Sequence, residues 1–149
     1  DISVIHPDQT PPKVNPGIPH LKLWQDVLKE LEEDIHSFAK VRPQLLKYRK
    51  HAGSDYYREA AILDKIIVLS ARNKPDFESK QVKGAEKFEL LKNNTYRYQY
   101  LMALGKLEKH FKLVNALAHD TQLYHVQRPV APLKLEQLAD FLMEKKLID

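Results

Sequence analysis

Glu33 and His36 are the pair whose residue types and spacing come nearest to a metal site. A separation of three places both side chains on one face of a helix, as in the Glu-x-x-His halves of carboxylate-bridged di-iron bundles. Such a site needs a second Glu-x-x-His and two further carboxylates. The sequence holds none, because Glu108 and His110 are only two residues apart. We therefore expect no metal ligands.

The other residues with catalytic potential do not form a recognisable set. His110, His119 and His125 are spaced by nine and six residues, which gives no common helical face, and no nucleophile motif lies near them. The chain has no cysteine, and its four glycines are too far apart for a phosphate-binding loop. The sequence predicts no catalytic residue, no cofactor and no small-molecule substrate, and thus a protein that is not an enzyme.

Positive charge is concentrated in one part of the chain. Residues 40–58 carry a net charge of +5, whereas residues 20–36 carry −3. Cations interleaved with aromatic rings suit phosphate contact and base stacking, as in Lys47-Tyr48-Arg49-Lys50. The candidate residues for binding structured RNA are Lys40, Arg42, Lys47, Arg49, Lys50 and Arg97. The alternative is that these cations only decorate solvated helix faces.

The first nineteen residues contain five of the nine prolines. Proline fixes φ and lacks a backbone donor, so residues 1–19 are expected to form an extended, polyproline-like arm. An ordered arm of this kind requires contacts that hold it. The candidate protein-binding residues on the arm are Ile2, Val4, Ile5, Pro11, Pro12, Val14 and Ile18.

From residue 20 onward, apolar residues repeat at spacings of three and four. Trp24, Leu28, Leu31, Ile35 and Phe38 show this period, which is typical of an amphipathic helix. The same pattern predicts helices over about 20–41, 55–72, 76–92, 95–119 and 133–147. The expected fold is an all-α bundle of four to five helices, a single helical domain over residues 20–149 preceded by the arm.

These observations favour a non-catalytic interaction or accessory subunit, a scaffold that docks other protein subunits through the arm and its helices. The alternative is an RNA-binding helical domain or ribonucleoprotein component that uses the basic middle region. No apolar run approaches eighteen residues, so no transmembrane segment is expected. An intracellular location is favoured. A start at Asp1 fits either a fragment or a processed organellar subunit.

Overall fold

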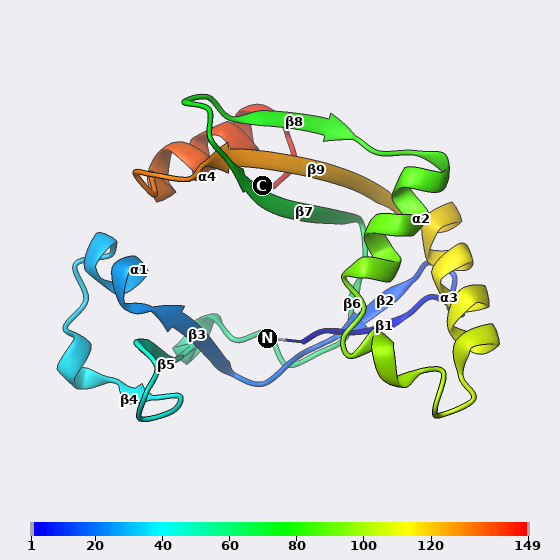
Figure 1. Ribbon diagram of the computed structural model, residues 1–149, viewed down its shortest axis with the longest axis horizontal. Helices are drawn as coiled ribbons and strands as arrows, with labels where there is room; N and C mark the ends of the chain where they lie inside the picture. The colour runs from blue at the N-terminus through cyan, green and yellow to red at the C-terminus, as the bar shows by residue number, and fades with distance from the viewer. Residues whose placement is uncertain (1, 149) are drawn as a thin grey trace.

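The computed structural model describes residues 2–148 and has a mixed α/β architecture (Figure 1). Within these residues, nine strands form three small three-stranded sheets, and four α-helices accompany them. The strands of the first sheet are not consecutive in the chain, because its third strand, β6 (Ala61–Ile62), comes after all the strands of the second sheet.

The proline-rich segment is extended, and it belongs to the first sheet. β1 (Val4–His6) pairs antiparallel with β2 (Lys13–Asn15), which also pairs with β6 (Ala61–Ile62). All five prolines of the segment lie outside the two strands, where the missing N–H removes no ladder bond. The Pro12 carbonyl accepts a hydrogen bond from the Leu63 amide at 2.8 Å, which ties the segment to the chain after β6.

The second sheet occupies most of the region expected to form the first helix. It consists of β3 (His20–Trp24), β5 (Lys47–His51) and β4 (Ala39–Lys40), in the order β3-β5-β4. Between β3 and β4 lie the short helix α1 (Gln25–Glu30) and a 3-10 turn, η1 (Ile35–Ser37). Helix α1 stops early because Glu32 has a φ of 54°, a left-handed conformation that a helix cannot continue through.

The third sheet is the largest. β7 (Lys65–Arg72) runs parallel to β9 (Gln122–Pro129), and β8 (Glu78–Gln81) pairs antiparallel with the other side of β9. Two helices, α2 (Gly84–Asn93) and α3 (Leu107–Asp120), connect β8 to β9. The last helix, α4 (Leu135–Glu144), follows β9.

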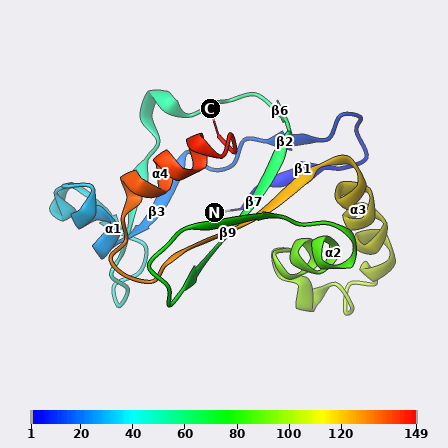
Figure 2. The same ribbon diagram turned by 90° about the horizontal axis from the view of Figure 1, so that it is seen from above.

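Apolar residues on the two faces of this sheet form two separate cores. One, the helix-pair core, is built from buried residues of α2, α3 and the sheet: Val82, Leu91, Val114, Leu117 and Leu123. The other, the α4 core, consists of Val126, Leu138 and Leu147, with Phe77 and Phe141 packed against them. Helix α4 accordingly lies on one side of the sheet and α2 with α3 on the other (Figure 2).

The expectation of an all-α helical bundle is wrong, since the chain forms three sheets. Residues 76–92, 95–119 and 133–147 do overlap α2, α3 and α4, but 20–41 and 55–72 are mainly strand and loop. A short apolar run such as Ile66–Leu69 fits a buried strand as well as a buried helix. Its pairing with β9, more than fifty residues later, decides in favour of strand. Within residues 2–148, no helix has the length and apolar character needed to cross a membrane.

Candidate interaction surfaces

One face of the second sheet presents cations and aromatic rings together. Residues directly opposite each other in an antiparallel pair share a face. The pairs His20↔His51, Lys22↔Arg49 and Trp24↔Lys47 therefore lie on the same side of β3 and β5. We name this set the basic–aromatic face: His20, Lys22, Trp24, Lys47, Arg49 and His51.

The geometry of this face suits an anionic, flat-ringed ligand. Trp24, the only tryptophan of the chain, is 49% exposed, and the Lys47 Nζ lies 5.0 Å from its ring centroid. The rings of His20 and His51 meet edge to face at 5.1 Å. The reverse side of β5 carries Tyr48, which is buried. Cations next to an exposed ring offer both phosphate contact and stacking.

The candidate RNA-binding residues divide between this face and other places. Lys47 and Arg49 lie on it. Lys50 points to the opposite side, where it forms an ion pair with Glu33, and Lys40 lies opposite Tyr48, also on that side. Arg42 is in the loop between β4 and β5, and Arg97 lies between α2 and α3 with its guanidinium 5.1 Å from the Tyr96 ring. Lys22 and Trp24 were missed, although alternation along residues 20–24 is a strand signal that could have found them.

The candidate arm residues also separate into two groups. Ile5 packs against the helix-pair core, Pro12 is buried, and Val14 is half-buried between β1 and β6. The other four, Ile2, Val4, Pro11 and Ile18, are exposed, and Ile18 is exposed by 75%. The segment is therefore anchored on its own chain, while part of its apolar surface remains open.

A second open surface lies at the connection between α2 and α3. Its exposed apolar side chains, here called the α2–α3 end, are Tyr96, Tyr100, Met102, Leu104 and Phe111. Beside it, a groove of about 470 Å³ runs between the two helices, with Phe88 and Phe111 in its wall and their ring centroids 5.2 Å apart. The groove is held open because α3 packs into the helix-pair core on its other side, through Val114 and Leu117.

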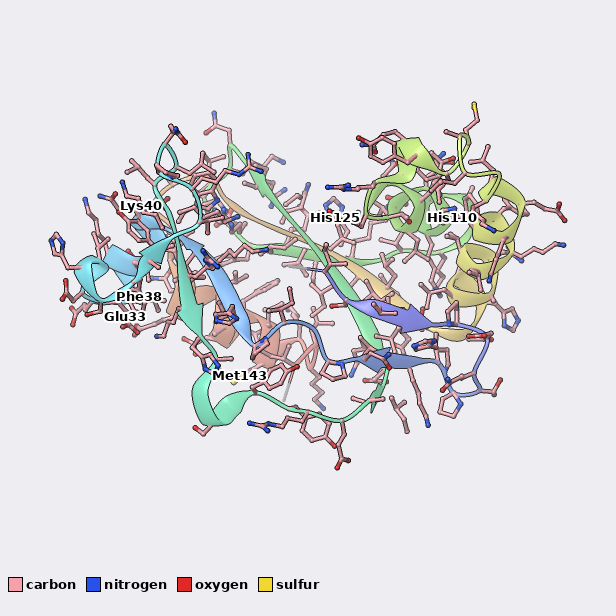
Figure 3. The ribbon with its side chains drawn as sticks, turned by 90° about the horizontal axis from the view of Figure 1, so that it is seen from below. Glu33, Phe38, Lys40, His110, His125 and Met143 are labelled. Atoms are coloured by element: carbon pink, nitrogen blue, oxygen red, sulfur yellow. The ribbon has the colours of Figure 1, made fainter. Side chains whose placement is uncertain are left out.

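The histidines and acidic residues with potential for catalysis or metal binding are widely separated. Glu33 lies near the second sheet and His110 lies on α3, with His125 on β9 between them (Figure 3). Glu33 is paired with Lys50 rather than with His36. Among the described residues, no group of three or more His, Cys, Asp or Glu side chains is placed to hold a metal ion.

Two histidines do contact hydroxyl groups. The His125 Nε2 lies 2.8 Å from the Ser70 Oγ, and the His110 Nε2 lies 2.9 Å from the Thr95 Oγ1. Among the described hydrogen bonds, neither imidazole has a carboxylate partner that would complete a triad. Burial lowers the pKa of His110. The Thr95 hydroxyl also donates a hydrogen bond to the Leu91 carbonyl at 3.1 Å, so it satisfies a carbonyl in the last turn of α2.

Comparison of the sequence with known protein families and with curated proteins, and of the structure with solved structures, found no match.

Proposed function

We propose that this protein is a non-catalytic component that works by binding other polypeptides, and that its open surfaces are covered in the resulting assembly. The single observation that carries the proposal is the extent of exposed surface. The chain exposes 10840 Å² at a mass of 17.4 kDa. A folded monomer of that mass is expected to expose about 7,900 Å².

The excess of about 3,000 Å² is large on the scale of protein interfaces. A stable interface of standard size covers about 800 Å² on each partner. The excess would therefore provide for an extensive, obligate-type contact or for several smaller ones. The excess surface arises because the three small sheets do not stack into one common core (Figure 1).

The character of the exposed side chains supports the same proposal. Among the described residues, ten hydrophobic side chains are buried, whereas twenty large ones are exposed. Exposed apolar residues that gather in one place mark a binding surface, in contrast to single scattered ones. The α2–α3 end is such a gathering, with Met102 exposed by 75%.

A capture experiment with matched variants tests the proposal. The immobilised chain is incubated with an extract of its source organism and compared with the triple variant Tyr100→Ser, Met102→Ser, Leu104→Ser. The control variant carries Lys106→Ser, Lys109→Ser and Lys112→Ser, which alter exposed residues nearby without removing apolar surface. We expect a polypeptide in fixed stoichiometry with the native chain and the control, and its loss with the triple variant. Absence of any stoichiometric polypeptide, or equal capture by all three proteins, would overturn the proposal.

The basic–aromatic face favours a second candidate function, the binding of single-stranded RNA. Lys47 and Arg49 lie beside Trp24 on one face of the second sheet. Two phosphate contacts with a single strand predict that log K falls with log salt at a slope of about −1.4.

A fluorescence titration tests this second function. A twelve-nucleotide oligouridylate is added to the protein at several salt concentrations, and the change in Trp24 fluorescence reports binding. Binding that weakens with salt at this slope, and that is lost in the Arg49→Glu variant, supports it. Binding that does not depend on salt, or that is absent at low salt, rules it out.

A further inference from the structure

The two edge strands of the third sheet differ sharply in composition. β8 is short and polar, with the sequence Glu-Ser-Lys-Gln. β7 has eight residues and a central run, Ile66–Leu69, without a single polar side chain. Native sheets protect their edges with short strands and charged side chains. β8 follows this rule, whereas β7 has the composition of a strand from the interior of a sheet.

The packing of β7 shows the same contrast. Ile66 and Val68 pack against the helix-pair core on one face, and Ile67 packs against the α4 core on the other. A strand covered on both faces by helices is typical of the middle of a parallel sheet. Within residues 2–148, however, β7 pairs only with β9, and its other edge carries no partner strand.

A free edge of this kind restricts what can cover it. The outer edge of β7 presents a row of backbone N–H and C=O groups, which only another extended backbone can satisfy in register. The side chains next to that backbone are apolar on both faces, and Leu69 is 49% exposed. An added strand would thus meet apolar neighbours above and below, which favours a segment that is itself apolar at consecutive positions.

We propose that β7 is completed by an added β-strand from a partner polypeptide, a segment with apolar residues at consecutive positions. The third sheet then has four strands, and β7 becomes an interior strand, as its composition requires. This inference rests on the proposed function and names one of the surfaces through which it acts.

A peptide probe tests the pairing. The probe is the fluorescein-labelled peptide acetyl-Lys-Thr-Val-Ile-Val-Thr-Lys-amide, and its control has the same sequence with N-methyl groups on Val, Ile and Val. The two share their side chains but differ in backbone donors. Fluorescence anisotropy is measured with the native chain, with Leu69→Lys on β7, and with Gln81→Lys on β8, which places the same cation on the opposite edge of the sheet.

We expect the unmethylated peptide to bind the native chain and Gln81→Lys alike. The methylated peptide should bind at least about tenfold more weakly, because it lacks the backbone donors of the strand pairing. The Leu69→Lys variant should also bind at least about tenfold more weakly, because a cation replaces an apolar neighbour of the added strand. Hydrogen exchange on the native chain should show new protection at residues 65–72 and none at residues 78–81. The exchange and methylation measurements use only the native chain, so they decide the matter even where Leu69→Lys does not fold.

Several results would overturn the strand pairing: no binding of the peptide, equal binding of its methylated form, or protection that lies outside residues 65–72. Dimerisation of the native chain that Leu69→Lys abolishes would also overturn it, because the occupant would then be a second copy. Each of these leaves the proposed function standing, since capture through the α2–α3 end does not depend on β7. Failure of capture together with peptide binding at β7 would instead contradict the broader proposal.

Discussion

Lys22 lies directly opposite Arg49 in the antiparallel ladder of β3 and β5. Like charges at such positions destabilise a sheet. Lys47 adds a third cation on the same face, one pair along the ladder. Lys47 and Arg49 lie on this face together with Trp24, which is why it is the surface to test for phosphate binding.

Replacing Arg49 separates the stability of this face from its binding. Arg49→Glu removes the like charge opposite Lys22, so we expect the free energy of unfolding to rise by about 0.5 kcal/mol. The same change should weaken oligouridylate binding by tenfold or more if the face binds RNA. Urea denaturation and the fluorescence titration measure the two effects. Lys106→Glu, outside this sheet, has the same change in charge and should leave the affinity within twofold.

The proline-rich segment should contribute to stability through Ile5 and not through Ile18. Ile5→Ala removes apolar atoms that pack against the helix-pair core, and we expect it to cost about 1–3 kcal/mol. Ile18 is 75% exposed, and Ile18→Ala should change the free energy of unfolding by less than about 0.5 kcal/mol. Urea unfolding of both variants tests the contrast. Equal effects would mean that the segment is not anchored through β1.

His110 predicts a pH dependence of stability. Burial lowers its pKa below the ordinary value of 6.5, so the unfolded chain binds more protons than the folded chain as the pH falls through 6.5. This contribution to stability is fully present above that pH and is lost on acidification. We expect His110→Gln to lose less stability than the native chain between about pH 7 and pH 5, as measured by urea denaturation across that range.

A His110→Gln curve parallel to the native one would contradict the role given to burial.

Lys87 is a buried cation that holds the end of α3. Its Nζ donates a hydrogen bond to the Thr121 carbonyl. Burial lowers the pKa of Lys87, and the opposing effect of the nearby Asp120 carboxylate is smaller. Lys87→Ala removes the packed stem and leaves the carbonyl without its donor, so we expect a loss of about 2–3 kcal/mol. Lys87→Met keeps most of the stem and should cost about 1 kcal/mol. Thermal unfolding compares them, and equal losses would show that only the ammonium matters.

The helices were predicted best where the apolar period was long. Residues 107–118 keep spacings of three and four, and α3 forms there. The expected start of that helix at residue 95 was too early, because Arg97 and Gly105 have φ values of 53° and 61°. The first expected helix was wrong because residues 20–24 find ladder partners in residues 47–51, far along the chain. The spacing of apolar residues within one segment does not show which distant segment pairs with it as a strand.

The sequence by itself determined the positions of the prolines, the concentration of cations in residues 40–58 and the absence of cysteine chemistry. These follow from residue type, since proline geometry, charge and thiol content are local properties. Only the tertiary structure decided which residues share a face. Pairing across the chain brings Lys22 beside Arg49, and it leaves the apolar run of β7 at the edge of a sheet. Strand partners are set by contacts between distant segments, which no local pattern specifies.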